Sequence, residues 1–388
     1  MERARRIQRL SSAIFTEMNE HKARVEAKGR KVINLGIGSP DRSPAPHIRE
    51  ALARALTRPG IFGYPTSEGS PELRQTVAHW YQRRFGVELD PVKEVLVLMG
   101  SQDGLAHLAT AFINPGDVAL IPDPGYPIYS AGILLAEGEV YPLPLVAERG
   151  FLPDLAAIPG EVARQAKLMV LNYPNNPVAA VADQDFFRQV VDFAREYGIM
   201  VCHDAAYSEL AFDGFKPMSF LEIPGAKEVG VEFHSLSKSY NLAGCRLGFI
   251  VGNAEVLAGL AVVKSNIDYG VFQAVQEAGI AALTGPQECT GENAMVYQRR
   301  RDILVEGLDR LDWHIPKPKG SMFLWAPLPW GYTSSKEFAL DLLEKAGVLV
   351  IPGIAFGKMG DGYVRIALTQ EEPLLQETVE RIKEAFKY

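Results

Sequence analysis

The chain has 388 residues, of which 47% are hydrophobic and 22% are charged, and its formal net charge is −7. This composition predicts a folded globular protein with a large core and excludes collagen-like and disordered classes. The acidic balance argues against a nucleic-acid surface, because neutralising phosphates requires a concentrated excess of basic residues.

The number and spacing of the cysteines indicate a reducing compartment, and the hydropathy pattern bears on membrane insertion. The three cysteines, Cys202, Cys245 and Cys289, are an odd number at unrelated spacings, so we expect neither a disulfide framework nor a metal site. No apolar run reaches the roughly 18 residues that a membrane-spanning helix needs. The sequence therefore predicts a cytoplasmic protein that binds neither membranes nor nucleic acid.

Short apolar segments alternate with helical patterns after an amphipathic helix or arm at residues 1–30. Strands that alternate with helices favour a mostly parallel sheet with helices on both faces, which is an α/β fold. The predicted strands are 94–99, 118–121, 168–171, 200–202, 231–233 and 247–251, and helix-like or loop-like material lies at 104–112, 183–197 and 217–221.

The C-terminal part of the chain has a different pattern. A long helical pattern leads from about residue 280 through Arg310, and strand-like segments follow at 323–325, 348–351 and 363–367. We expect these elements to form a smaller α+β unit that packs with the N-terminal arm. The predicted division is an arm with part of the small domain at 1–40, a large domain at 41–280 and a C-terminal small domain at 281–388.

Polar residues follow the predicted strands, at the sheet edge where open α/β folds bind ligands. Ser101 and Gln102 lie in a turn that opens a helix; such a turn can hold a phosphate, or it can be a plain turn. Asn176 follows another strand in a loop with two prolines, and its amide can donate to a phenolate oxygen or bond its own backbone.

The strand at 200–202 is followed by three further polar side chains. The carboxylate of Asp204 can pair with a protonated pyridine nitrogen, or it can cap the next helix. Tyr207, three residues later, can donate to the same phenolate oxygen as Asn176. We interpret His203 as a packed side chain rather than a catalyst.

The segment 234–246 is the most informative part of the sequence. Lys238 stands among Ser235, Ser237 and Ser239, and Arg246 follows eight residues later. A lysine amine condenses with an aldehyde to a Schiff base, and hydroxyls together with a guanidinium bind a phosphate dianion. Pyridoxal 5′-phosphate (PLP) offers both groups. Because Lys238 follows an apolar strand, we expect its aliphatic stem to be partly enclosed, which lowers the proton affinity of the amine.

Seven motifs in a fixed order link the chain to a known family. They are 36–40, Tyr64 with 69–74, 123–127, 172–177, 204–207, 235–238 with Arg246, and Arg365. On these motifs the chain resembles the class I aminotransferases of PLP fold type I over essentially its whole length. The resemblance implies that fold, with a mostly parallel sheet, helices on both faces and a smaller α+β domain.

The resemblance also implies a role for each matching position. Lys238 would form the Schiff base and carry the proton, with Asp204 on the pyridine nitrogen and Tyr207 as the other catalytic residue. Asn176 and Tyr207 would bind the 3′-oxygen of PLP, and Tyr126 would stack on its ring. The implied phosphate ligands are Ser101, Gln102, Ser235, Ser237 and Arg246, with Tyr64 from a neighbouring subunit, which implies a homodimer.

The implied substrates are an L-amino acid and a 2-oxo acid. Arg365 would clamp the α-carboxylate, aided by Gly38, Tyr126 and Asn176. The implied reaction moves an amino group between the two substrates in ping-pong half-reactions through Lys238.

Segments 33–38, 176–182 and 264–274 look most like the LL-diaminopimelate aminotransferase branch, which transfers nitrogen between glutamate and tetrahydrodipicolinate in lysine biosynthesis. The chain has Ser-Ser-Ala at 11–13 where that branch tends to carry Pro-Pro-Tyr, and Gln102 where a lysine is usual. The alternatives are an aspartate, alanine or aromatic aminotransferase, or a PLP-dependent C–S lyase of the same fold. Glu68 can meet a distal ammonium, but we interpret it as an exposed loop residue.

Overall fold

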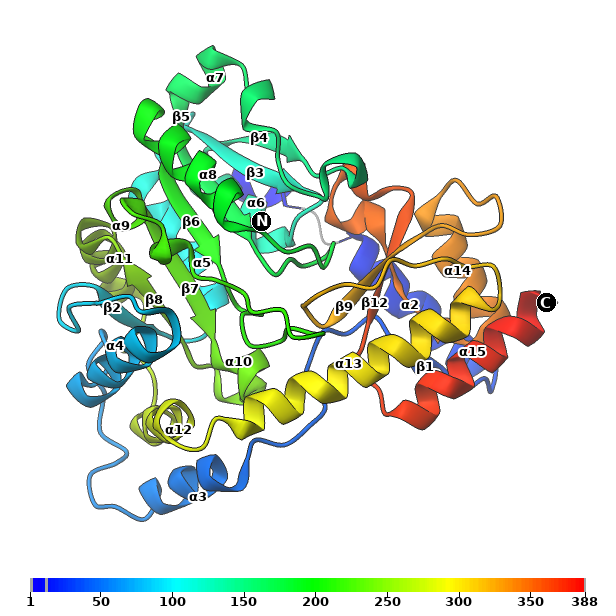
Figure 1. The fold of residues 1–388 in the computed structure, drawn as a ribbon, viewed down its shortest axis with the longest axis horizontal. Coiled ribbons are helices and arrows are strands. Elements are labelled where there is room, and N and C mark those ends of the chain that lie inside the picture. The colour runs from blue at the N-terminus through cyan, green and yellow to red at the C-terminus, as the bar shows by residue number, and fades with distance from the viewer. Residues whose placement is uncertain (1–2, 11–12, 387–388) are drawn as a thin grey trace.

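The structure is a computed structural model that describes residues 3–10 and 13–386 (Figure 1). Its larger part is a seven-stranded sheet in the order β2-β8-β7-β6-β5-β3-β4. Neighbouring strands are parallel except at β8, which is antiparallel to β2 and β7. The mostly parallel α/β fold is therefore confirmed. The strands are β2 (Val95–Leu98), β3 (Val118–Asp123), β4 (Glu139–Pro144), β5 (Ala166–Asn172), β6 (Met200–Asp204), β7 (Gly230–Ser235) and β8 (Gly248–Gly252).

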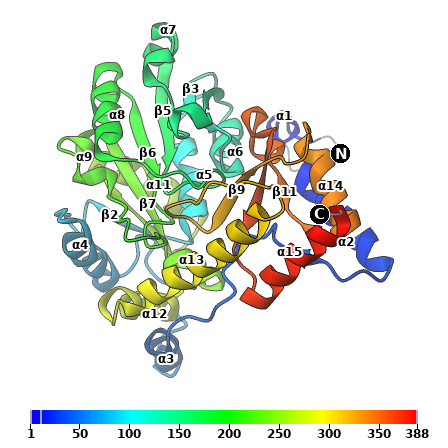
Figure 2. The same ribbon diagram turned by 45° about the vertical axis from the view of Figure 1, so that its right-hand side comes forward.

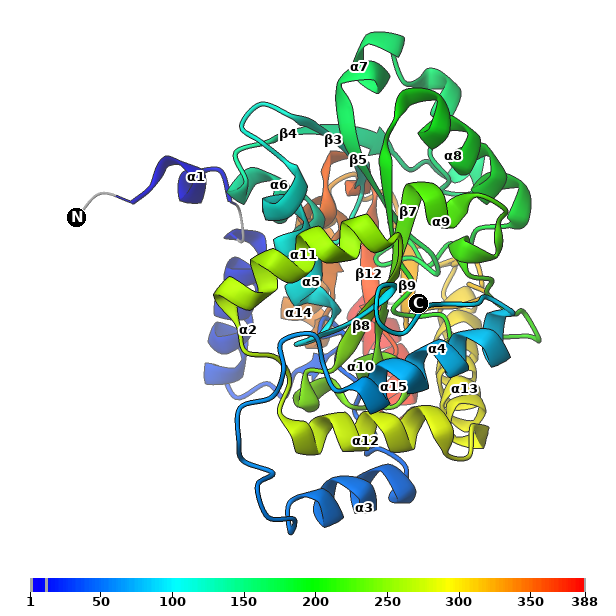
Figure 3. The ribbon, with the colours of Figure 1, turned by 90° about the vertical axis from the view of Figure 1, so that its left-hand side faces the viewer.

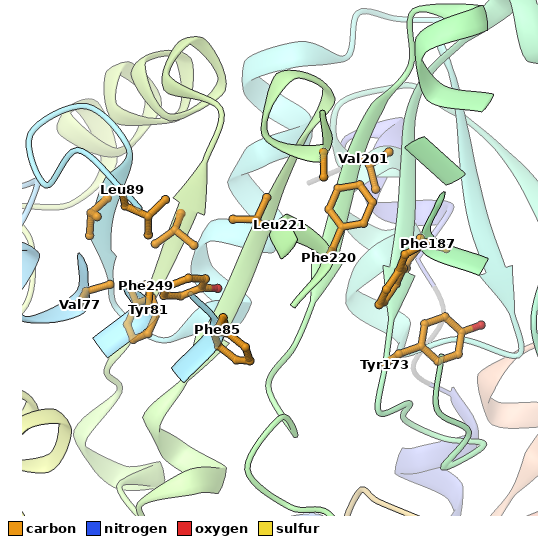
Figure 4. Packing of buried hydrophobic residues seen from close by; sticks show 14 of the residues in the cluster. Val77, Tyr81, Phe85, Leu89, Tyr173, Phe187, Val201, Phe220, Leu221 and Phe249 are labelled. Atoms are coloured by element: carbon orange, nitrogen blue, oxygen red, sulfur yellow. The ribbon is translucent and has the colours of Figure 1, made fainter. Parts of the chain in front are cut away.

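Helices cover both faces of this sheet (Figure 3). Val95 and Val97 of β2 belong to one hydrophobic cluster, whereas Leu96 and Leu98 belong to another, because successive side chains of a strand point to opposite faces. The first cluster includes Phe187 of helix α8, and part of it is drawn in Figure 4. Its helices are α3 (Pro46–Ala55), α4 (Pro71–Phe85), α8 (Gln184–Tyr197) and α12 (Gln273–Thr284); those of the opposite face are α5 (Ser101–Phe112), α6 (Pro127–Leu135) and α11 (Ala254–Ile267).

A smaller unit is built on a three-stranded antiparallel sheet, β11-β12-β9, and on the parallel pair β1 and β10. Met18 and Ile33 belong to its hydrophobic cluster, so the N-terminal arm packs with this unit, as the sequence predicts. Its strands are β1 (Ile33–Asn34), β9 (Phe323–Pro327), β10 (Val348–Leu349), β11 (Ile351–Pro352) and β12 (Tyr363–Ala367). Its helices are α2 (Ala13–Ala27), α13 (Glu288–Asp309), α14 (Ser335–Ala346) and α15 (Glu372–Phe386).

The long helix α13 joins the two parts of the molecule, because it starts near α12 and ends alongside α15 (Figure 2). The domain bounds taken from the sequence stay a prediction. Among residues 3–10 and 13–386, no helix has the length and apolar character needed to cross a bilayer.

The predicted elements differ from the structure in several places, and the short strand β1 and several helices are among the elements that were not predicted. Strand β4 was not predicted; it lies at the sheet edge, and only its Leu143 is buried, so its apolar signal is weak. The predicted strand at 348–351 is divided, because β10 pairs with β1 and β11 pairs with β12. Helix α5 begins at Ser101 rather than at 104, directly after the positive-φ residue Gly100.

The remaining elements are short. They are α1 (Arg5–Gln8), α7 (Gly160–Gln165), α9 (Ala226–Val229), α10 (Leu236–Ser239), and the 3-10 turns η1 (Ala147–Arg149), η2 (Leu155–Ala157), η3 (Phe220–Glu222), η4 (Ala243–Cys245), η5 (Gly353–Phe356) and η6 (Lys358–Gly360).

Candidate active site

A cavity of about 500 Å³ lies at the carboxyl ends of the parallel strands, and the smaller unit closes it with β9 and β12. Every predicted site residue except Tyr64 lines this cavity. The lining residues are Gly38, Ser39, Ser101, Gln102, Leu105, Tyr126, Tyr129, Asn176, Asp204, Ala206, Tyr207, Ser235, Ser237, Lys238, Ala243, Gly244, Arg246, Phe323 and Arg365. The predicted strand ends therefore do converge on one place.

Lys238 projects into the cavity from the short helix α10, which follows β7. Its Nζ donates to the carbonyl oxygen of Gly38 at 2.6 Å. Burial, and then the charges of Arg365 and Arg246, lower the pKa of this amine to about 8. The unprotonated, nucleophilic fraction of this amine near neutral pH is therefore much larger than that of an ordinary lysine.

Asp204 ends β6 on the same side of the sheet and is buried. Its Oδ2 accepts a hydrogen bond from Tyr129 Oη at 2.8 Å, and its Oδ1 accepts one from the backbone N–H of Ala206 at 3.1 Å. Burial raises the pKa of Asp204, and these two bonds oppose the shift. The carboxylate has no basic side chain bonded to it among the described residues, so a cationic nitrogen from a ligand would stabilise it.

Asn176 and Tyr207 meet at one wall of the cavity. The Asn176 side chain hydrogen-bonds to the hydroxyl of Tyr207, and burial raises the pKa of that phenol well above its ordinary value. Asn176 is held from behind, since its N–H donates to Asn172 Oδ1 at 2.7 Å. Tyr126 Oη donates to Gln102 Oε1 at 3.1 Å, which ties this lining aromatic ring to the first turn of α5.

One end of the cavity is lined by the start of α5 at Ser101, by the hydroxyls of Ser235 and Ser237, and by the guanidinium of Arg246. Ser237 Oγ is buried and has no hydrogen-bond partner within the described part of the chain. A Cβ added to Gly100 would lie 2.6 Å from Arg246 Nη2, so the absence of a side chain there lets the guanidinium approach the start of α5. An anion fits this end, because amides, hydroxyls and a cation converge on it.

Arg365 projects from β12 toward the same cavity and is buried. Its Nη1 donates to Asn176 Oδ1 at 2.9 Å and its Nη2 donates to the carbonyl oxygen of Gly36 at 2.8 Å, whereas its Nε has no partner among residues 3–10 and 13–386. Burial lowers the pKa of this guanidinium to about 10. A buried cation with an unused N–H is suited to binding a carboxylate.

Sequence reasoning missed several residues of the site. Tyr129 bonds to Asp204, and Phe323 lies 4.3 Å under the Arg365 guanidinium. The ring of Phe356 also packs on that guanidinium, with its centroid 4.7 Å from Arg365 Cζ. No local signal marks these aromatics, because each looks like an ordinary core residue in its own segment.

Two of the candidate residues lie outside the cavity. Tyr64 is 89% exposed, in line with a role toward a neighbouring chain rather than its own cavity. Glu68 is exposed, as the sequence interpretation holds. The departure at 11–13 rests on Ser11 and Ser12, which lie outside the described residues.

A buried polar network lies behind the site. Glu232 accepts hydrogen bonds from His203 Nδ1 at 2.8 Å, His234 Nε2 at 3.0 Å and Tyr81 Oη at 2.7 Å, besides Ser219 Oγ and the N–H of Phe220. Burial favours the neutral carboxyl, but the hydrogen bonds from the two histidines outweigh it, and the pKa of Glu232 is well below its ordinary value. His203 is thus a packed, bonded side chain, as predicted.

These features fit PLP. The cavity offers an amine for the aldehyde, a buried carboxylate for the pyridine nitrogen and an anion site with an unpaired hydroxyl for the phosphate. The fold and site together define a PLP-binding enzyme that handles carboxylate-bearing substrates.

Comparison with known proteins gives the family. Residues 30–382 match the family model described as aminotransferase class I and II. The chain is 54% identical over 383 residues to an LL-diaminopimelate aminotransferase of Moorella thermoacetica, covering 99% of this chain and 98% of that protein. The same name belongs to a Syntrophobacter fumaroxidans protein that is 54% identical over 381 residues, covering 98% of each.

Solved structures agree with this result. Substrate-bound BacF from Bacillus subtilis superposes with a TM-score of 0.95 at 40% identity, covering 99% of this chain and 98% of that one. A mutant aspartate aminotransferase of Thermus thermophilus has a TM-score of 0.93 at 28% identity, covering 99% of this chain and 100% of that one. The chain belongs to the class I and II aminotransferases. It is a PLP-dependent enzyme that transfers amino groups between amino acids and 2-oxo acids.

Proposed function

We propose that the enzyme is an LL-diaminopimelate aminotransferase that exchanges an amino group between glutamate and tetrahydrodipicolinate in lysine biosynthesis. One observation carries the reaction type: a single cavity holds both the amine of Lys238 and the buried, incompletely bonded guanidinium of Arg365. The substrate rests on the relatives that bear this name at 54% identity over nearly the whole chain. Three free cysteines and a role in amino acid biosynthesis support a cytoplasmic location.

The cofactor would be held by the residues that line the inner part of the cavity. Asp204 would contact the pyridine nitrogen, Asn176 and Tyr207 the 3′-oxygen, and Tyr126 the face of the ring. The phosphate would be bound by Ser101, Gln102, Ser235, Ser237 and Arg246. When bound, PLP supplies an aldehyde that captures the substrate amine and a ring that stabilises negative charge at the substrate α-carbon.

Lys238 and Asp204 would divide the proton chemistry. The Nζ of Lys238, with its lowered pKa, can remove the proton from the α-carbon and deliver it to a neighbouring carbon. Asp204 would remain ionised opposite a cationic nitrogen, since Tyr129 and Ala206 already hydrogen-bond to the charged form. Tyr207 would hold its proton through these steps, because burial keeps the phenol neutral.

Arg365 would orient the substrate through its α-carboxylate. Asn176 and Gly36 hold the guanidinium fork from one side, which leaves Nε and the remaining N–H groups for the ligand. The carbonyl oxygen of Gly38 accepts a hydrogen bond from Lys238 Nζ and would hold the amine close to the bound substrate.

A homodimer is part of the proposal. Phe62 and Phe272 stack with ring centroids 5.8 Å apart, and Tyr64 and Tyr269 lie 5.2 Å apart, although all four are exposed on one protomer. A partner subunit would cover these aromatics and receive Tyr64 at its phosphate site. Sedimentation of the holoenzyme should give a dimer, and Tyr64→Phe should weaken PLP binding; a monomer with full activity would contradict this part.

A half-reaction panel tests the substrate. The holoenzyme is mixed in single-turnover experiments with glutamate, aspartate, alanine, an aromatic amino acid and LL-diaminopimelate, and absorbance follows conversion of the cofactor to its amino form. Glutamate and LL-diaminopimelate should react with the highest kcat/KM. Preference for aspartate, alanine or aromatic substrates would overturn the assignment. Release of pyruvate and ammonia from a sulfur amino acid would instead identify a lyase.

A further inference from the structure

Two segments from different parts of the molecule are bonded together beside the cavity. Strand β3 ends at Asp123, and the turn after it leads to Tyr126 and α6. Asp123 does not line the active-site cavity; its carboxylate bonds to the first two residues of η6, which follows η5 after the single residue Gly357. Its Oδ1 accepts from the N–H of Met359 at 3.1 Å, and the N–H of Lys358 also bonds to it.

Backbone contacts extend this connection. The N–H of Gly125 donates to the carbonyl oxygen of Phe356 at 2.8 Å. Gly357 has a φ of +138°, and a Cβ there would lie 2.0 Å from Asp123 Oδ1. The loop backbone therefore packs directly on the carboxylate, and glycine is required at this position by both conformation and space.

An aromatic residue of the active-site region lies next to each side of this connection. Gly125 immediately precedes Tyr126, whose ring lines the cavity. On the other side, the ring of Phe356 covers the guanidinium of Arg365 at 4.7 Å. Phe356 is held from behind by Phe15, with ring centroids 5.8 Å apart in an edge-on arrangement. A shift of the loop would move Phe356, and Arg365 would lose one of the two rings that enclose it.

We propose that Asp123 is a positioning residue for the substrate carboxylate: by holding the loop 356–359 against the Tyr126 turn, it fixes Phe356 and hence the guanidinium of Arg365 relative to the ring of Tyr126. The inference rests on the proposed roles of Arg365 and Tyr126. It assigns Asp123 to amino acid binding and not to cofactor binding, because its carboxylate bonds only to the loop of the smaller unit among the described residues.

The chain offers a matched control at the other end of the same strand. Asp117 precedes β3, and its carboxylate likewise accepts a backbone hydrogen bond, from the N–H of Asn114 at 2.8 Å. That turn lies far from the cavity lining. Asp123→Ala and Asp117→Ala therefore remove equivalent loop-fixing carboxylates, of which only one is connected to Phe356.

The test compares these variants as holoenzymes, after the wild type has shown a half-reaction with glutamate. For Asp123→Ala, the apparent dissociation constant of glutamate in the single-turnover reaction should rise about tenfold, with the maximal rate changed less than about threefold. The dissociation constant of PLP should change less than about twofold. Asp123→Asn, whose amide oxygen still accepts from Met359, should recover most of the glutamate affinity, and Asp117→Ala should match the wild type.

A second variant keeps the test decisive if Asp123→Ala folds poorly. Gly357→Ala forces the loop away from the carboxylate while Asp123 stays in place, and it should by itself weaken glutamate binding about as much as Asp123→Ala does, with PLP affinity changed little. Unchanged glutamate affinity with only a lowered melting temperature would overturn the inference, and so would a loss confined to PLP affinity or to the maximal rate. Absence of any half-reaction in the wild type would instead refute the proposed function.

Discussion

Replacing Arg365 with alanine gives the sharpest test of the substrate site. The guanidinium is buried, two of its N–H groups bond to Asn176 and Gly36, and its Nε has no hydrogen-bond partner in the described part of the chain. Arg365→Ala removes the cation that would pair with the α-carboxylate common to all amino acid substrates. We therefore expect every amino acid to be affected alike, whatever its side chain.

The size of the effect follows from burial. Removing one partner of a buried, hydrogen-bonded charge pair costs about 2–5 kcal/mol, which corresponds to a loss of about 30- to 5,000-fold in kcat/KM. Arg365→Lys keeps the charge but loses the planar fork and its packing between Phe323 and Phe356. It should recover only part of the loss, since a point charge cannot bond to Asn176, Gly36 and the ligand in the same geometry.

Single-turnover absorbance with glutamate, alanine and LL-diaminopimelate measures this effect. PLP affinity and the free energy of unfolding serve as controls, and both should change little compared with kcat/KM. If the loss falls on one substrate only, Arg365 reads a side chain and not the common carboxylate. If kcat/KM stays within a few-fold of the wild type, the carboxylate binds elsewhere, and the assignment of the cavity is wrong.

Four further outcomes follow from the site. Lys238→Ala should retain PLP through its noncovalent contacts yet lose turnover, and a variant that still turned over would refute the role of the amine. Since burial lowers the pKa of Lys238 to about 8, covalent capture of PLP by the apoenzyme should accelerate as pH rises and be half-maximal near pH 8, whereas a midpoint near 10 would show an unperturbed amine. Ser237→Ala should weaken PLP binding about 10-fold or more without loss of apoenzyme stability, because its hydroxyl has no partner among the described residues; titration and denaturation check both. Glu232→Gln should lower the free energy of unfolding by about 3–5 kcal/mol in urea, because it disturbs a buried carboxylate bonded to His203 and His234, and a change below 1 kcal/mol would contradict that network.

Much of the fold could be predicted from local patterns. The strand segments were located because each is a short apolar run between turn residues, and strands of a parallel sheet are buried on both faces. Strand β4 was not predicted, because it is an edge strand with one buried residue and therefore lacks a continuous apolar run. The antiparallel direction of β8 was not predicted either, since the composition of a strand does not report its direction.

The sequence by itself determined that Lys238, Asp204 and Asn176 meet in one place, because each lies at or just after the end of a strand, and the carboxyl ends of parallel strands meet at one edge. Only the tertiary structure decided what surrounds them. Phe323 and Phe356 pack on Arg365 within the smaller unit, and Asp123 of the larger sheet holds the loop of Phe356 through backbone hydrogen bonds that join the two units. Such contacts depend on how the two parts pack in space, and a periodicity read along one segment contains no information about a partner more than two hundred residues away.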